Sequence, residues 1–369
     1  MLVGEPLTAI GALNMLTKLL IGLALLLVSA LVAMFWMTRD GSVVTPQGSG
    51  TVATASGQFE AFPLPDYADK ALPGGYKSYL VEVEPGIKIH VLEAGSGIPI
   101  YLQHGNPTNG LLYRKVWQAL PTDRMRLIMP TMVGLGFSSK IPASQHTLEN
   151  HIRWMNTALR QLKLGGVVYV GQDWGGAVGL GALMRSPELL RGMVVLNTGW
   201  TAPKEKFELS RPHAIAATPI VGEILLENVV SLFDRLHETQ GDPASIPPDV
   251  AALYGRPVIE SGNRKGPLAL MRMVPTGPDH PTSKPMAAIE HYAGTLNIPT
   301  EIVWGMRDPI LARALPTMKA MYPTAHVTET QAGHFLQEEV PVEIADAITR
   351  VVAAVQAEQP ALRAAAKPE

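Results

Sequence analysis

The chain has 369 residues with nearly balanced charges, 30 Lys and Arg against 32 Asp and Glu, which gives a formal net charge of −2. This balance excludes the basic footprint of a nucleic-acid-binding protein, and the proportions of 47% hydrophobic and 17% charged residues exclude a disordered chain. The sequence contains no cysteine, which excludes disulfides, thiolate metal ligands and cysteine nucleophiles.

An apolar run near the amino terminus, residues 19–37, contains no charged residue. A helix of this length spans about 28 Å, close to the hydrocarbon thickness of a bilayer. Lys18 and Arg39 flank the run, and Trp36 lies near its end, where interfacial aromatic residues are common. A cleaved signal peptide is the alternative, but the apolar run continues beyond the small residues that would form a cleavage site. We therefore expect an uncleaved single-pass anchor.

The residues that follow the apolar run predict a tether and an orientation. Residues 41–57 carry no charge and are rich in Gly, Ser and Thr, which is typical of a flexible linker. Lys18 precedes the run, whereas Asp40 offsets Arg39 after it, and this asymmetry favours an inside amino terminus. The rest of the chain is then expected on the periplasmic or extracellular side of a membrane.

Beyond residue 77, short apolar segments alternate with helical patterns. This alternation predicts an α/β fold, a mostly parallel eight-stranded sheet flanked by helices. Helices are expected at 148–162, 177–184 and 342–355. The expected strands are 79–83, 87–92, 98–103, 126–129, 167–171, 193–196, 300–304 and 326–330.

One connection in this pattern is much longer than a crossover requires. About a hundred residues separate the strand at 193–196 from the strand at 300–304, whereas a crossover needs about a dozen residues plus loops. We expect an inserted helical cap, with one helix near 224–237. The predicted divisions are a flank at 1–18, a transmembrane helix at 19–37, a linker at 38–60, a core at 61–198 and 297–358, a cap at 199–296 and a tail at 359–369.

The motif Val170-Gly171-Gln172-Asp173-Trp174-Gly175-Gly176 lies between a predicted strand and a predicted helix. It has the layout of a nucleophile elbow, with Asp where serine hydrolases have Ser. Glycines around the centre permit a tight turn that presents the Asp173 carboxylate above the sheet. An Asp in a glycine-rich turn is more often a helix cap, so the assignment depends on companion residues.

Three companion residues follow other predicted strands. Asn106, in His104-Gly105-Asn106-Pro107-Thr108, follows the strand at 98–103, where its backbone N–H and that of Trp174 could form an oxyanion hole. Asp308 follows the strand at 300–304, and His334 follows the strand at 326–330. Alone, these residues are typical of an Asn-Pro turn, a loop Asp and an ordinary His. The order Asp173, Asp308, His334 is that of nucleophile, acid and base in nucleophile-elbow hydrolases.

From about residue 80 to 355 these motifs resemble the α/β-hydrolase superfamily and, within it, the haloalkane dehalogenases. The resemblance implies that Asn106 and Trp174 bind the departing halide. Asn197 occupies the position at which one branch of the family has its catalytic acid. Asp308, after the seventh predicted strand, is therefore similar to the acid of the other branch.

The function expected from these residues is hydrolysis of a haloalkane to an alcohol and a halide. Asp173 would displace the halide and form an alkyl ester, and His334, held by Asp308, would activate the water that hydrolyses the ester. Neither step requires a metal or an organic cofactor, so none is expected. The expected partners are the haloalkane, water, the halide product and, through residues 19–37, a membrane.

Other functions are compatible with parts of this pattern. An epoxide hydrolase shares the Asp nucleophile and uses a pair of cap tyrosines, for which Tyr254 and Tyr292 are candidates, although Asn106 stands where that class has an aromatic residue. Fluoroacetate dehalogenation needs an Arg near the nucleophile, and Arg114 is the candidate. A membrane-tethered binding protein with a vestigial site would keep its function in the variant Asp173→Ala.

Overall fold

A ten-stranded sheet forms the centre of the structure, a computed structural model that describes residues 7–358. The strand order is β1-β2-β3-β4-β6-β5-β7-β8-β9-β10. Neighbours from β1 to β6 in this order pair antiparallel, and all pairs from β6 to β10 are parallel. The mostly parallel sheet is confirmed, with ten strands in place of the eight predicted.

All eight predicted strands are present, several with up to three extra residues at an end. The parallel strands at the centre are buried along their whole length because helices cover both faces of the sheet. The strands are β1 (Thr51–Thr54), β2 (Gly57–Ala61), β3 (Tyr76–Glu84), β4 (Ile87–Gly95), β5 (Ile98–Gln103), β6 (Met125–Pro130), β7 (Val167–Gly171), β8 (Leu190–Leu196), β9 (Thr300–Gly305) and β10 (His326–Thr330).

The segment predicted as a flexible linker, 38–60, is different in the structure: it contains β1 and β2, which extend the sheet. Ser56, in the turn between these strands, donates a hydrogen bond to the carbonyl of Leu162 and accepts one of 2.7 Å from the Arg126 guanidinium. Val44 forms an isolated antiparallel bridge with Lys140. The prediction was wrong because composition does not show that partners elsewhere in the chain hold this segment. The core therefore begins before residue 61.

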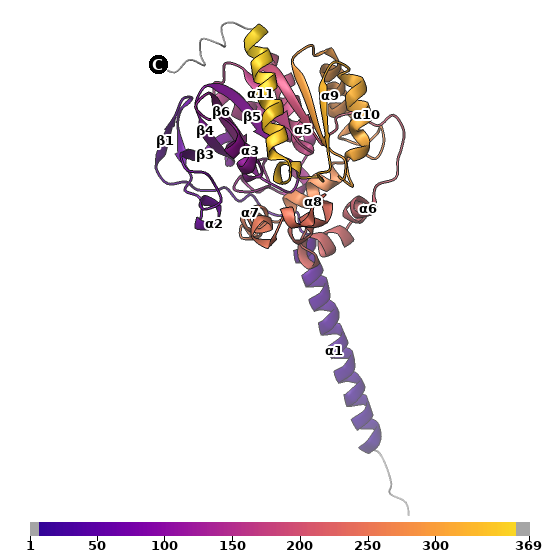
Figure 1. Ribbon diagram of the computed structural model, residues 1–369. Coiled ribbons are helices and arrows are strands. Elements are labelled where there is room, and N and C mark those ends of the chain that lie inside the picture. The colour runs from indigo at the N-terminus through magenta and orange to yellow at the C-terminus, as the bar shows by residue number, and fades with distance from the viewer. Residues whose placement is uncertain (1–6, 359–369) are drawn as a thin grey trace, which may run out of the picture.

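Helices cover the sheet on both faces and also form the cap (Figure 1). On one face, α11 packs against α3 and β8, and on the other α4 packs against α5 and α5 against α9. The predicted helix at 224–237 is instead two short helices, η4 and η5, broken after Val229. Besides α1, the α-helices outside the cap are α2 (Asp66–Asp69), α3 (Arg114–Ala119), α4 (Leu148–Gln161), α5 (Trp174–Met184), α10 (Leu315–Met321) and α11 (Pro341–Glu358). The helices within 199–296 are α6 (Arg211–Ala217), η4 (Glu223–Val229), η5 (Phe233–Thr239), η6 (Pro243–Ser245), α7 (Pro248–Ile259), α8 (Lys265–Arg272) and α9 (Ser283–Thr295).

The amino-terminal helix α1 (Leu7–Thr38) projects from the body at the end where α6, α7 and α8 gather (Figure 1). Its segment Thr17–Thr38 has a mean hydropathy of 2.6, is not buried inside the structure, and is long and apolar enough to cross a membrane. The helix includes the predicted run at 19–37 and extends into the predicted flank. The predicted tail, 359–369, and residues 1–6 lie outside the described residues.

Candidate active site

Asp173 lies in the sharp turn that joins β7 to α5. Its backbone has φ 50° and ψ −132°, a conformation that costs free energy for any residue with a side chain. Neighbouring chain approaches closely here: a Cβ atom on Gly105 would lie 2.4 Å from the Asp173 Cβ, and one on Gly175 would lie 2.4 Å from the Gln103 carbonyl oxygen. Glycines therefore permit the strained turn and the loop after β5 to lie against each other.

The end of β8 holds this turn in place. The Asp173 N–H donates a 2.8 Å hydrogen bond to the Asn197 carbonyl, and the Thr198 hydroxyl donates one of 2.6 Å to the Asp173 carbonyl. The carboxylate oxygen Oδ1 of Asp173 accepts a 2.8 Å hydrogen bond from the Asn106 N–H. The structure thus brings the first predicted oxyanion donor to the nucleophile, whereas the Trp174 N–H forms no bond with the Asp173 carboxylate in the described structure.

His334 lies between the two predicted carboxylates. Its Nε2 is 3.6 Å from Asp173 Oδ2, and its Nδ1 donates a 2.9 Å hydrogen bond to Asp308 Oδ2. Asp308 also accepts hydrogen bonds from the Asn197 side chain at 2.8 Å and from the Ile310 N–H at 2.7 Å. The three residues predicted from separate segments therefore form one connected constellation at the carboxyl ends of β7, β9 and β10.

The electrostatics of this constellation make His334 easier to protonate than a free histidine. Burial opposes protonation of His334, but the charge of Asp308, its hydrogen bond and the charge of Asp173 together raise the pKa of His334 above its ordinary value. Burial acts to raise the pKa of Asp308, yet His334 and the donors from Ile310 and Asn197 lower it. Asp308 is thereby kept ionised, and it fixes the His334 tautomer with Nε2 toward Asp173.

Asn106 and Trp174, the predicted halide donors, lie on the two chain segments that meet at Asp173. The Asn106 amide donates a 3.1 Å hydrogen bond to the Pro267 carbonyl at the start of α8, which leaves its second N–H available. Trp174 is 7% exposed, and its indole N–H forms no hydrogen bond within residues 7–358. This N–H is not one of the polar atoms that are buried without a partner, so it remains open to an acceptor from outside the chain.

Sequence reasoning missed two residues of the site. Gln172 donates a 3.0 Å hydrogen bond to the His334 carbonyl, which ties the nucleophile turn to the loop that carries the base. His213 of α6 lies close enough to Asp173 and His334 for their charges to act on it, and burial lowers its pKa. Gln172 lies within the nucleophile-elbow motif and could have been predicted as a site residue from it. No local sequence pattern identifies His213 in the cap.

His104, at the start of the same loop, has a structural role. Its Nδ1 donates to the Gly105 carbonyl at 2.8 Å, and its Nε2 accepts from the Met132 N–H at 3.0 Å. Burial lowers the pKa of His104 to about 4, so the ring is neutral and both nitrogens have partners. The ring braces the loop that places Asn106.

The candidates for the alternative functions have other partners in the structure. Arg114 forms a buried two-bond ion pair with Glu338, and Tyr254 donates its phenol hydrogen to the same carboxylate. Tyr292 lies on α9 and is packed, partly buried, against the hydrophobic core. Arg114 is thus not free to clamp a substrate carboxylate, and Tyr254 is not free to protonate an epoxide oxygen.

The Glu338 cluster supports a prediction on stability. Glu338 is buried and also lies 3.1 Å from the Lys115 ammonium. In the variant Glu338→Gln, Arg114 would remain buried without a counter-charge, and we expect a loss of about 3–5 kcal/mol in the free energy of unfolding. Urea unfolding of the full chain in detergent, followed by fluorescence, measures this. The matched control is Glu329→Gln, in a half-exposed pair with Lys319, which should cost less than about 1 kcal/mol; equal effects would contradict the prediction.

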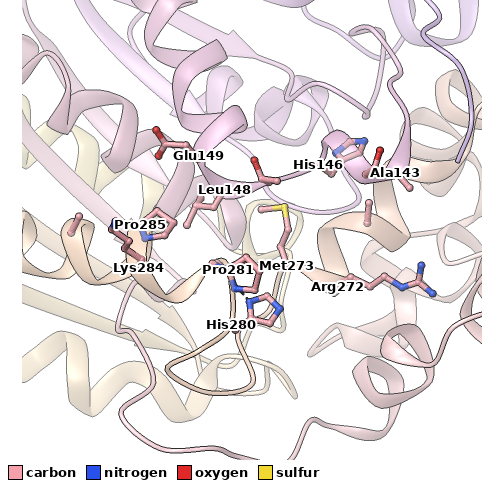
Figure 2. Close-up of a pocket in the computed structure, with 15 residues that line it drawn as sticks. Ala143, His146, Leu148, Glu149, Arg272, Met273, His280, Pro281, Lys284 and Pro285 are labelled. Atoms are coloured by element: carbon pink, nitrogen blue, oxygen red, sulfur yellow. Dashed lines mark hydrogen bonds between the residues drawn. The ribbon is translucent and has the colours of Figure 1, made fainter.

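A cavity of about 760 Å³ lies at the seam between the cap and the core (Figure 2). Core residues His146 and Glu149 lie on one side, and cap residues Met273 and His280 on the other (Figure 2). None of Asp173, Asp308 and His334 lines it, so this cavity is separate from the catalytic constellation.

The arrangement of the Asp173 turn, the Asn106 loop and the His334 loop at one edge of this sheet is that of an α/β hydrolase. The family model described as alpha/beta hydrolase fold matches residues 98–341, and the chain belongs to that family.

Comparisons with individual proteins give a narrower family. Haloalkane dehalogenase 1 of Mycobacterium tuberculosis is 30% identical over 259 residues, which covers 67% of this chain and 81% of the relative. The cis-3-alkyl-4-alkyloxetan-2-one decarboxylase of Shewanella oneidensis is 28% identical over 270 residues, 70% of this chain and 83% of the relative. The solved structure of the haloalkane dehalogenase DatA from Agrobacterium tumefaciens has a TM-score of 0.67 and 28% identity, and covers 76% of this chain and 99% of that one. Within the α/β hydrolases, the chain belongs to the haloalkane dehalogenase family of hydrolases acting on carbon–halide bonds.

Proposed function

We propose that this protein hydrolyses haloalkanes to an alcohol and a halide through a covalent ester of Asp173. The observation that carries the proposal is the placement of the two carboxylate oxygens. Oδ1 is held by the Asn106 N–H, and Oδ2 faces the His334 Nε2 at 3.6 Å. One oxygen is thus fixed by a donor that can later stabilise an oxyanion, and the other is available for attack.

In the first step, Asp173 Oδ2 attacks the halogen-bearing carbon in line with the carbon–halogen bond. The bond breaks, and its electron pair leaves with the halide. The Trp174 indole N–H and the free Asn106 side-chain N–H stabilise the charge that develops on the halide, so these donors act more strongly in the transition state than in the ground state.

In the second step, His334 Nε2 takes a proton from a water molecule whose oxygen attacks the Asp173 carboxyl carbon. Negative charge develops on Oδ1, where the Asn106 N–H already points. The bond between the carboxyl carbon and the alkyl oxygen then breaks, and His334 returns its proton to that oxygen, so the alcohol leaves. The new carboxyl group loses its remaining proton to solvent, and the carboxylate is restored. Asp308 stabilises the transient imidazolium through the 2.9 Å hydrogen bond to Nδ1.

The test is an assay on the full chain in detergent with 1-bromobutane, 1,2-dibromoethane, styrene oxide and a cis-3-alkyl-4-alkyloxetan-2-one. We expect bromide release from the haloalkanes and its loss in Asp173→Asn. Opening of styrene oxide without bromide release would favour the epoxide hydrolase, and turnover of the oxetanone alone would favour the reaction named for the Shewanella relative. A chain that turns over none of them but keeps its fold would favour the tethered binding protein.

Loss of a halide donor should lower the rate without abolishing it. We expect Trp174→Phe to reduce kcat/KM for 1-bromobutane about 100-fold, the usual effect of removing one donor from a developing anion. The control is Trp200→Phe, because the Trp200 indole is buried and donates to the Met321 sulfur at 3.2 Å, away from the nucleophile. Steady-state bromide release measures both, and equal losses would contradict the halide role of Trp174.

The rate of ester hydrolysis should rise with pH through the pKa of His334, because only a neutral imidazole accepts a proton from water. Although burial opposes it, Asp308 and Asp173 raise this pKa in the free protein. Ester formation removes the Asp173 charge, so the pKa that governs hydrolysis should be lower than that of His334 in the free protein. Rapid-quench decay of the ester, compared with an NMR titration of the free protein, measures the two values. Equal values would contradict the assignment.

We also propose that α1 anchors the enzyme in a membrane, with the catalytic domain on the exported side. The unburied apolar segment Thr17–Thr38 and the position of Lys18 support this. Resistance of the protein to alkaline carbonate extraction, together with an intact amino terminus by sequencing, tests the anchor. A mature chain that begins after the apolar run would establish a signal peptide instead.

A further inference from the structure

The carboxyl-terminal end of α1 and the residues directly after it, 37–42, are hydrogen-bonded to the body. We call this segment the foot of α1. Lys265, the first residue of α8, donates a 3.0 Å hydrogen bond from Nζ to the Met37 carbonyl. Asp40 accepts 2.8 Å hydrogen bonds from the N–H groups of Ala143 and Ser144, and Ser42 accepts one of 2.7 Å from the Asn263 side chain. The last residues of the apolar helix and the first residues after it are therefore held against both cap and core.

This docking places the cap at the membrane surface if α1 spans the bilayer. Trp36 is 57% exposed, and the Arg39 guanidinium lies 4.3 Å above its ring, an arrangement suited to the headgroup region. Met37, the next residue, is already bonded to the cap. No residues lie between the end of the apolar segment and its contact with the cap, so the body lies directly at the lipid surface. The cap is the part of the body from which α1 leaves (Figure 1).

The cap has an exposed apolar patch beside this foot, which we call the cap patch and define as Ile220, Val221 and Val229. Their exposures are 44%, 41% and 65%. Val229 is the last residue of η4, which packs against α1. Large apolar side chains gathered on an exposed surface mark a site of interaction with a protein or a membrane.

The charges of η4 face away from the solvent. Glu227 pairs with Lys265 at 2.7 Å and Glu223 pairs with Arg272 at 2.6 Å, so both acidic side chains are directed to α8. This arrangement removes the negative charge that would oppose contact with an anionic lipid surface. The exposed surface of η4 therefore consists of apolar side chains and Asn228.

The helix α8 connects the element that carries the cap patch with the loop beside Asp173. Lys265 and Arg272 of α8 pair with Glu227 and Glu223 of η4. Lys265 also donates to the Met37 carbonyl, and the Pro267 carbonyl accepts from the Asn106 amide. The helix that contacts the Asn106 loop is thus also bonded to η4 and to the foot of α1.

We propose that the cap patch rests in the surface of the bilayer, and that the enzyme takes its substrates, haloalkanes with long alkyl chains, from the lipid phase. This proposal rests on the proposed dehalogenation and on the anchor. The substrate claim follows from the position of the cap at the bilayer. A long-chain haloalkane dissolved among acyl chains is concentrated next to the cap, whereas the local concentration of a short, water-soluble haloalkane is not raised there.

The contact with lipid is tested by site-directed labelling, which the cysteine-free sequence permits without background. Val229→Cys and the control Val342→Cys, which is 57% exposed at the start of α11, are labelled with bimane in the full chain. The protein is reconstituted in vesicles of phosphatidylethanolamine and phosphatidylglycerol that contain nitroxide-labelled lipid. We expect quenching and a blue shift at position 229 only. Absence of quenching at 229, equal quenching at both positions, or failure of the protein to float with the vesicles would overturn the proposal.

The source of the substrate is tested with 1-bromohexadecane dissolved in the same vesicles and 1-bromobutane in the water. In the double variant Val221→Asp and Val229→Asp, bromide release from 1-bromohexadecane should fall about tenfold, while release from 1-bromobutane stays within about twofold. Val342→Asp should change neither rate. Equal loss on both substrates, or no loss on either, would overturn the proposal. If the unaltered enzyme releases no bromide from any haloalkane, the proposed function and the substrate claim both fail, and the bimane result still decides the lipid contact.

Discussion

Replacing Asp173 should abolish halide release from every haloalkane, with a loss in kcat of about 10⁴–10⁶-fold, comparable to the loss of a nucleophile in other hydrolases. The reason is that the described structure offers no substitute carboxylate. Asp308 is buried, bonded to His334, Asn197 and Ile310, and separated from the nucleophile turn by the imidazole. Halide release in the variant would then depend on solvent water alone.

The choice of substitution matters because Asp173 has a positive φ. Alanine would add backbone strain and remove the acceptor for the Asn106 N–H, so a loss of activity could reflect a displaced loop. Asparagine tolerates this backbone region better and keeps the shape and an acceptor oxygen. We therefore expect Asp173→Asn to unfold at the same urea concentration as the unaltered protein while releasing no halide. Residual turnover above about 0.01% of the unaltered rate, with mass spectrometry excluding deamidation back to Asp, would contradict the nucleophile role.

The parts of the fold that sequence could predict are those with local signals. The strands at the centre of the parallel sheet, such as β7, are continuous apolar runs, because helices bury both of their faces, and such runs are visible without any knowledge of neighbours. The turn at Asp173 is similarly local, since its glycines and its strand and helix lie within a short segment. The positions of Asp308 and His334 followed because the carboxyl ends of parallel strands meet at one edge of a sheet.

The parts that could not be predicted depend on distant partners. The strands β1 and β2 have a linker composition, and their turn is held at Ser56 by Arg126 and Leu162. The sequence makes Tyr254 a candidate cap tyrosine, but in the structure its hydroxyl donates a hydrogen bond to the Glu338 carboxylate. Neither pairing has a signature in the local sequence, because a buried polar contact is chosen by the tertiary fold and not by spacing along the chain.

The site shows the same division between local and distant information. The sequence predicted Asn106 and Trp174 as donors, but not that the carbonyl of Pro267 would hold the Asn106 amide. This contact joins the Asn106 loop to α8 and, through Lys265, to the carboxyl-terminal end of α1. The cap therefore contacts both the loop beside Asp173 and the apolar amino-terminal helix, a connection that only the three-dimensional arrangement reveals.

Replacing His334 with glutamine should separate the two chemical steps. Alkylation of Asp173 needs no base, so the variant should release about one equivalent of bromide per enzyme from 1-bromobutane and then stop. Hydrolysis of the ester, which loses its general base, should slow by about 10²–10⁴-fold. The trapped enzyme should carry a butyl group on the peptide that contains Asp173, as measured by mass spectrometry.

The same variant distinguishes the ester mechanism from direct attack by water on the haloalkane. If water attacked the substrate directly, loss of the base would slow halide release itself, and no alkylated peptide would form. The control is His326→Gln, because His326 is largely exposed and pairs with Glu301 at the edge strand β10. That variant should turn over normally. A His334→Gln enzyme that shows neither a burst nor an adduct would therefore contradict the covalent route, even if Asp173 proved essential, since an essential carboxylate is also compatible with a base that activates water.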